Sequence, residues 1–278
     1  IITVAILTGA AGGRMRFTPL IIFIVFWLFL VYVPFAHMVW GGGLLAQWGT
    51  IDFAGGDVVH ITSGVSGLVL AIVLGKRRDY DRLDYRPHNV PFVLLGAGIL
   101  WLGWFGFNAG SALAADGLAV HALITTHVSA AAAMFLWLMI EKFLTGKFSL
   151  VGASTGLVAG LVAITPGAGF VSIWSSLLIG LIVSPFCYYG ISVLKSKLGY
   201  DDALDAFGCH GIGGIVGGIL TAIFTTPDLA LDSANIGLIY GSGRLLLVTL
   251  AGILVTIVWS AVATYAIIKV ISFFTPIR

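Results

Sequence analysis

Apolar segments long enough to cross a lipid bilayer fill this 278-residue chain from end to end. A membrane helix needs about 20 mainly apolar residues. Such runs occupy residues 18–37, 52–75, 90–112, 118–142, 149–166, 171–194, 206–225 and 242–272. Short loops join them, and the short alternating segments of a β-barrel are missing. The sequence therefore predicts an all-α polytopic membrane protein in which residues 1–278 form a single transmembrane domain.

Composition supports this fold class. Apolar residues make up 59% of the chain and charged residues 9%, with a mean hydropathy of +1.07. The 37 glycines suit helices that associate through close packing of small faces. A net charge of +2 is too small to indicate a nucleic-acid partner. Cys187 and Cys209 both lie in apolar runs, which favours small core residues over a disulfide.

Ile1–Ala10 is apolar but too short to span a bilayer, which predicts that the chain begins inside a membrane helix. With this partial helix, we expect nine crossings. Basic residues accumulate on the cytoplasmic side of membrane proteins, and alternate loops here hold 13 of the 14 Lys and Arg residues. They are Arg14, Arg16, Lys76, Arg77, Arg78, Arg82, Arg86, Lys142, Lys147, Lys195, Lys197, Lys269 and Arg278. This distribution predicts a cytoplasmic C-terminus.

Two apolar segments carry a histidine in a matched setting. His60 and His210 are both followed by glycine four and seven residues later, and an aspartate precedes each of them, at Asp52 and Asp205. The predicted topology makes the two helices antiparallel. Related segments on antiparallel helices indicate an inverted repeat, with the functional site between the two halves. We therefore expect an inverted-repeat helical bundle in which both imidazoles approach one another near the middle of the bilayer.

The two histidines admit two interpretations. A glycine-flanked histidine is often a packed, hydrogen-bonded core residue, whereas ionisable groups at membrane depth usually mark a conduction path. Their related positions favour lining of a path, where imidazole donates from one nitrogen and accepts on the other. Further Cys, Asp or His ligands at suitable spacing are missing, so a zinc site fits poorly and no metal is expected.

Trp40 and the segment from Trp104 through Phe107 to Ser111 end two helices on the predicted external side, near the expected mouth. Aromatic faces attract cations, and a hydroxyl accepts N–H bonds, so these residues suit a small cation. An interfacial aromatic belt is the alternative interpretation. Asp52 and Asp205 are expected to cap their helices, with Asp52 also shaping the cation site. Asp57, in the next turn, is expected to be either exposed or capping.

Several motifs resemble the ammonium transporter (Amt/Rh) superfamily, closest to its bacterial Amt branch. They are Asp52-Phe53-Ala54-Gly55-Gly56-x-Val58-Val59-His60, Ala36-His37-Met38-Val39-Trp40-Gly41-Gly42-Gly43, Gly103–Ser111 and Asp205-x-Phe207-Gly208-x-His210-Gly211. The resemblance covers the whole chain. It implies eleven helices in a complete subunit, of which this chain would lack the first two, most of the third and an acidic tail after Arg278. It also implies a homotrimer with one substrate path per subunit.

The same resemblance implies roles for individual residues. Trp40, Phe107 and Ser111 would form the external ammonium site, with Phe107 as one of two stacked gate phenylalanines, the other lying outside this chain. His60 and His210 would be the paired pore histidines, and Asp52 the aspartate that organises the mouth. A cytoplasmic regulator of the PII type is implied as a partner.

The expected function is transport of ammonium, ammonia or methylammonium across the cytoplasmic membrane, without a cofactor and without catalysis. An ammonium sensor that signals to the cytoplasm is one alternative. An intramembrane serine hydrolase using Ser111 and a histidine is another, although no oxyanion arrangement is evident. Gas conduction, as proposed for the Rh branch, is an alternative within the transporter class.

Overall fold

The computed structural model describes residues 1–80, 82 and 87–278. Its α-helices are α1 (Ile2–Ala11), α2 (Phe17–Trp27), α3 (Val33–Trp40), α4 (Leu44–Trp48), α5 (Thr62–Leu74), α6 (Val90–Gly110), α7 (Gly117–Thr145), α8 (Leu150–Ile164), α9 (Ile173–Tyr189), α10 (Lys195–Leu198), α11 (Ile212–Phe224) and α12 (Arg244–Phe274). Wider π-helical turns form η1 (Leu28–Tyr32), η2 (Gly56–Ile61), η3 (Gly190–Leu194) and η4 (Phe207–Gly211), and η5 (Leu238–Tyr240) is a 3₁₀ turn.

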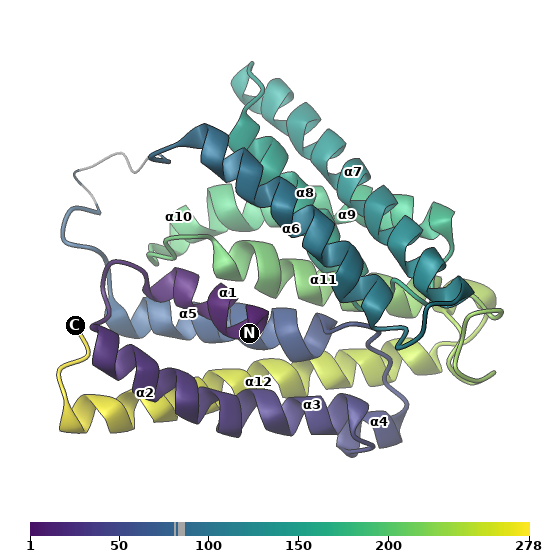
Figure 1. The fold of residues 1–278 in the computed structure, drawn as a ribbon, viewed down its shortest axis with the longest axis horizontal. Coiled ribbons are helices and arrows are strands. Elements are labelled where there is room, and N and C mark those ends of the chain that lie inside the picture. The colour runs from purple at the N-terminus through teal and green to yellow at the C-terminus, as the bar shows by residue number, and fades with distance from the viewer. Residues whose placement is uncertain (81, 83–86) are drawn as a thin grey trace.

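The predicted all-helical membrane fold is confirmed. Within the described residues, seven helical segments are long and apolar enough to cross a membrane, and two shorter apolar helices, Ile2–Ala11 and Leu150–Ile164, match the remaining predicted crossings. Figure 1 shows α6–α9 as one group, and α12 beside α2 and α3 along the opposite edge. The two segments that bear the histidines, η2–α5 and η4–α11, pack against one another between these groups.

Two glycines allow the histidine-bearing helices to cross closely. A Cβ added to Gly64 would lie 2.3 Å from the backbone nitrogen of Gly211. In the matching position, a Cβ on Gly214 would lie 2.9 Å from Cγ1 of Ile61 and 3.1 Å from Cβ of His60. The fourth residue after each histidine thus faces the residue that follows the other histidine. This reciprocal contact requires antiparallel helices related by an approximate two-fold axis, so the inverted repeat is confirmed at its centre.

A hydrogen bond from Trp259 joins the long helix α12 to the α2–α3 segment, next to a proline. Pro34 has no N–H and cannot bond to the carbonyl of Leu30, four residues earlier. The indole nitrogen of Trp259 on α12 donates to that carbonyl instead, at 2.9 Å. The wider turn of η1 accommodates the proline, and the indole satisfies the carbonyl that the proline leaves unpaired.

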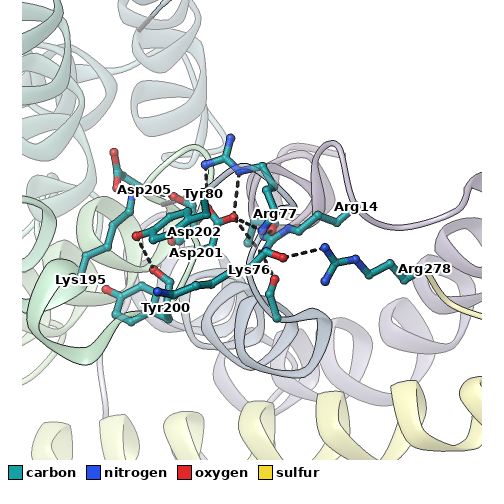
Figure 2. A network of polar contacts seen from close by, with 12 residues as sticks. Arg14, Lys76, Arg77, Tyr80, Lys195, Tyr200, Asp201, Asp202, Asp205 and Arg278 are labelled. Atoms are coloured by element: carbon teal, nitrogen blue, oxygen red, sulfur yellow. Dashed lines mark hydrogen bonds and ion pairs between the residues drawn. The ribbon is translucent and has the colours of Figure 1, made fainter. Parts of the chain in front are cut away.

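Basic residues from distant parts of the chain gather at one end of the bundle (Figure 2). Arg77 clamps the carboxylate of Asp201 through Nε–Oδ2 at 2.8 Å and Nη2–Oδ1 at 2.7 Å. The Nη1 atom of Arg14 lies 3.6 Å from the same carboxylate. This clamp joins the loop after α5 to the loop before η4, so it holds the end of the first histidine-bearing segment against the start of the second. Arg86, another of the predicted cytoplasmic residues, lies outside the described residues.

Neutralising Asp201 is expected to destabilise the folded protein. Burial alone would raise the pKa of Asp201, but hydrogen bonds from Arg77 and the charge of Arg14 outweigh burial and hold that pKa below its ordinary value of 3.8. Asp201→Asn leaves Arg14 buried without its partner, so the free energy of unfolding should fall by about 3 kcal/mol at neutral pH. Thermal unfolding in detergent measures this loss, with the exposed Asp228→Asn as the control.

The pH dependence of this difference has a defined sign. A carboxyl whose folded-state pKa is lowered contributes stability above the unfolded pKa and loses it as pH falls through the folded pKa. The gap between wild type and Asp201→Asn should therefore be complete above about pH 4 and shrink on further acidification. Burial raises the pKa of Asp202 and Asp205, but both groups are present in both proteins. A gap that is independent of pH, or no gap at neutral pH, would contradict this role.

Candidate functional site: a histidine pair walled by aromatic rings

Asp52 caps the turn that carries the first histidine. Its Oδ1 accepts from the backbone N–H groups of Gly55 at 2.8 Å and Gly56 at 2.6 Å, and its Oδ2 accepts from Asp57 at 2.9 Å. These N–H groups have no partner within the helix, so the carboxylate accepts their hydrogen bonds. Its negative charge also interacts favourably with the positive end of the helix dipole. Gly55 has a φ of +123°, which disfavours any side chain at this position. The capping role predicted for Asp52 is confirmed.

His60 and His210 meet at the helix crossing, as predicted. Their Nδ1 atoms are 3.2 Å apart and their ring centroids 5.2 Å. Each histidine lies in a π-helical turn, η2 for His60 and η4 for His210. In η2 the N–H of His60 bonds to the carbonyl of Gly55, five residues earlier, at 3.0 Å. Wider turns of this kind are frequent at functional sites, and here they occupy corresponding places in the two repeats.

The hydrogen bonds of Thr165 indicate which ring nitrogens of the histidine pair carry protons. Its hydroxyl donates to the carbonyl of Leu161 at 2.7 Å, so toward His60 Nε2, at 3.3 Å, it acts as an acceptor. His60 therefore carries its proton on Nε2, which leaves Nδ1 as an acceptor. His210 donates to it from its own Nδ1, and the Nε2 atom of His210 is left as an unprotonated acceptor. The pair thus offers one imidazole lone pair to a donor such as an N–H group.

Aromatic rings form a wall beside the pair. Trp104 stacks on His60 with a centroid distance of 5.4 Å and an interplanar angle of 15°. Its indole nitrogen also donates to Thr165, at 3.0 Å. Phe107, one turn further along α6, meets both rings edge-on, with its centroid 6.1 Å from that of His60 and 5.4 Å from that of Trp104. The immediate surroundings of His60 are therefore aromatic, and it is fully buried.

The other predicted mouth residues lie near this aromatic wall, but not all of them contact it. Ser111 donates its hydroxyl to the carbonyl of Phe107 at 2.9 Å, which places both residues at the end of α6. Trp40 is 46% exposed and donates its indole N–H to the backbone carbonyl of Asp52 at 2.8 Å. The ring contacts in the described part of the chain leave Trp40 outside the Phe107–Trp104–His60 group. Asp52 is the residue that ties Trp40 to the first histidine segment.

Two predictions about aspartates are wrong. Asp205 does not cap the second histidine turn, because its carboxylate pairs with Lys195 at 2.6 Å. Asp202 caps that turn instead and accepts from the N–H of Phe207 at 2.8 Å. Asp57 is neither exposed nor a cap. It is only 7% exposed, and its backbone N–H is itself bonded to Asp52.

Sequence reasoning also missed three residues of the site. Thr165 lies 105 residues from His60 in the chain, and nothing in its local sequence indicates that it bonds to two side chains of the site. Trp104 was expected at the external mouth but is buried against His60. For Asp202, the available signal was the Asp201-Asp202 pair a few residues before the histidine, where a helix start is expected to have an acidic cap.

The geometry argues against a serine hydrolase. Ser111 bonds to a backbone carbonyl, while the ring nitrogens of His60 are engaged by Thr165 and His210. A nucleophilic serine needs a base within hydrogen-bonding reach. Ser111 therefore lacks the partner that the hydrolase alternative requires. The buried Cys187 and Cys209 are free thiols, in agreement with the predicted core role.

Comparison with known proteins gives a consistent result. The sequence model of the Ammonium Transporter Family matches residues 1–278. An ammonium transporter of Bacillus subtilis is 50% identical over 278 residues, which are 100% of this chain and 68% of that protein. An ammonium transporter of Aquifex aeolicus is 48% identical over 277 residues, which are 100% of this chain and 64% of that protein. The chain thus spans about two thirds of the length of these curated relatives.

Solved structures show the same fold. Saccharomyces cerevisiae Mep2 superposes with a TM-score of 0.88 at 40% identity, over 95% of this chain and 62% of that one. A protein described as a sensor Amt protein superposes with a TM-score of 0.92 at 31% identity, over 100% of this chain and 70% of that one. The paired histidines therefore lie in a framework shared with these solved structures, and the chain belongs to the Ammonium Transporter Family.

Proposed function

We propose that the protein moves ammonium, as ammonia plus a proton or as ammonia alone, inward across the cytoplasmic membrane. The observation that carries this proposal is the His60–His210 pair, with Nδ1 atoms 3.2 Å apart at the crossing of two related membrane segments. Ionisable side chains at membrane depth usually mark a conduction path, and the Nε2 atom of His210 is left to accept a hydrogen bond from a polar substrate. Family membership supports the choice of ammonium as that substrate.

Selection of ammonium over potassium follows from hydrogen bonding. The two ions are similar in size and charge, so selection by a ring of carbonyl oxygens would separate them poorly. Ammonium donates N–H bonds and can lose a proton, whereas potassium can do neither. The free Nε2 atom of His210 accepts an N–H bond but gives a potassium ion little compensation for its lost water. An ion that cannot shed its charge is therefore rejected by the apolar path.

Purified full-length protein in proteoliposomes tests this function. An inward gradient of ammonium or methylammonium should produce uptake that empty liposomes do not show, and an equal potassium gradient should not. Current recorded on the same vesicles reports whether charge moves with the substrate. Equal uptake by protein-containing and protein-free vesicles would refute the proposal.

Trp40, Phe107 and Ser111 are proposed to recruit the cation at the external mouth. An aromatic face attracts a cation by roughly 0.5–2 kcal/mol. Trp40→Leu should therefore raise the ammonium concentration that half-saturates transport by roughly 2- to 30-fold, with little change in the maximal rate. Trp174→Leu, a change of another exposed tryptophan, is the matched control. An unchanged half-saturating concentration in the Trp40 variant would leave the aromatic-belt interpretation standing.

The sensor alternative has one observation in its favour, because a solved neighbour at 31% identity is described as a sensor Amt protein. Signalling that persists in a variant unable to transport would support a sensor role here. The homotrimer, the PII-type partner and the cytoplasmic C-terminus that were expected from the sequence stay predictions.

A further inference from the structure

Asp57 is a buried carboxyl that takes no part in the contacts of the histidine pair. It is 7% exposed, lies in η2 between Asp52 and His60, and its Oδ1 has no hydrogen-bond partner among the described residues. An unpaired buried polar atom destabilises the fold, and an unpaired buried charge does so more strongly. An unpartnered carboxyl at this depth therefore calls for an explanation.

Among the residues that the structure describes, no basic side chain acts on Asp57 to neutralise it. Of the elements packed against η2, α1, α8 and α11 carry no titratable side chain, α3 carries His37, and η4 carries Cys209 and His210. Arg244 and Lys269 of α12 are each at least 12 residues from Thr256, the α12 residue beside Asp57, or about 18 Å along a helix. The charged group that acts on Asp57 is the carboxylate of Asp52, which has the same sign. A carboxyl buried without a counter-ion avoids this cost by binding a proton.

The hydrogen bonds of Thr256 also indicate that Asp57 is protonated. Its hydroxyl lies beside Asp57 but donates its only proton to the carbonyl of Gly252, at 2.8 Å. Toward Asp57 the hydroxyl can therefore only accept. A carboxylate has no proton to give, whereas a carboxylic acid donates one. The local geometry is satisfied when Asp57 is protonated.

A row of hydroxyls continues from this carboxyl along α12. Thr256, Ser260 and Thr264 follow at successive turns, and all are fully buried. Thr264 donates to Ser66 of α5 at 2.8 Å, while the hydroxyl of Ser260 has no partner within the described residues. The row covers about 12 Å of the membrane. Reorientable hydroxyls and an unpartnered one form a polar seam between α12 and the first histidine segment.

We propose that Asp57 is a proton-binding carboxyl that receives the proton released when ammonium becomes ammonia. The inference rests on the proposed function. One N–H bond of ammonium breaks, its electron pair stays on nitrogen, and ammonia continues along the path. The released proton reaches Asp57 by way of His60, three residues away. Because Asp57 is protonated at rest, the arriving proton adds to its unpartnered Oδ1 while the resting proton leaves the other oxygen for Thr256 and the row of hydroxyls. One proton enters and one leaves, so the carboxyl is protonated before and after the step.

Infrared spectroscopy of the full-length protein tests whether Asp57 carries a proton. At neutral pH the wild type should show the carbonyl band of a protonated carboxyl, and Asp57→Asn should lack it. Ser260→Ala should keep the band, because that change leaves the carboxyl in place. Asp57→Glu serves if the asparagine variant does not fold, since it should move the band without removing it. A protonated-carboxyl band that is identical in the wild type and both Asp57 variants would overturn the proposal.

Transport tests the role of that proton. Asp57→Asn should lower the maximal rate of methylammonium uptake by about tenfold or more, as loss of a positioned proton acceptor does. The half-saturating concentration should stay near wild type, and Asp57→Glu should restore most of the rate. An uptake rate in Asp57→Asn equal to that of Asp228→Asn would refute the role. If wild type itself shows no uptake, the proposed function fails, but the infrared result still decides whether Asp57 binds a proton.

Discussion

Replacing His210 with leucine is expected to lower ammonium transport by about a hundredfold, the lower end of what a positioned acid or base contributes. Leucine keeps the bulk of the side chain but removes the Nε2 lone pair that is proposed to accept an N–H bond from ammonium. It also leaves Nδ1 of His60 without its donor. Selectivity over potassium should fall as well, since the remaining path distinguishes the two ions less by hydrogen bonding. Parallel uptake and current measurements in proteoliposomes check both effects.

A matched histidine outside the pair controls for this result. His127 on α7 stacks on Trp101 with a centroid distance of 5.0 Å and takes no part in the pair. His127→Leu should transport ammonium close to the wild-type rate. His60→Leu should behave like His210→Leu, with an added loss of stability because Thr165 and Trp104 lose a partner. Normal rate and selectivity in both pair variants would show that the imidazoles are only packing residues.

Adding a single methyl group at Gly64 is expected to prevent the protein from folding correctly. The new Cβ would lie 2.3 Å from the nitrogen and 2.5 Å from the Cα of Gly211. These are backbone atoms, so no side chain can rotate away, and the two helices would have to separate. The cost should exceed about 3 kcal/mol, beyond the usual penalty for overpacking a core. Yield of folded protein by size-exclusion chromatography and thermal unfolding measure the loss.

Gly218→Ala provides the matched control for Gly64→Ala. It lies on α11, and its added methyl group would meet the end of the flexible Ile253 side chain at 3.3 Å. A small shift of that side chain makes room, while alanine favours the helix by up to about 1 kcal/mol. Gly218→Ala should therefore fold almost as well as wild type. Equal stability of the two variants would mean that the helices are not held together by the close crossing at Gly64.

The sequence is most informative where a local pattern determines the structure. Apolar runs of bilayer length predict the helices, and the matched spacing of glycines after His60 and His210 predicts their antiparallel crossing. Asp52 lies at a helix start, where a carboxylate has unpaired N–H groups to bond. Each of these inferences needs only a few neighbouring residues and a general physical rule.

Contacts between distant residues could not be predicted in this way. Thr165 acts on the pair only because its turn packs against the Asp52–Gly56 segment, where the N–H of Phe53 bonds to the carbonyl of Pro166 at 3.0 Å. The exchange of roles between Asp202 and Asp205 depends on the position of Lys195, one helix away. The burial of Asp57 depends on α12, which lies nearly 200 residues later in the chain. The helices follow from local patterns, while the proton positions depend on tertiary contacts.

Nitrogen NMR of the full-length protein in lipid, with ¹⁵N-labelled histidine, tests the central claim most directly. Without substrate, His60 and His210 should each show one protonated and one unprotonated ring nitrogen, with coupling between the two Nδ1 atoms across their hydrogen bond. Saturating ammonium should shift the Nε2 signal of His210, because this lone pair is proposed to accept an N–H bond from the substrate. A spectrum without that coupling, or one that saturating ammonium leaves unchanged, would contradict a substrate path lined by this pair.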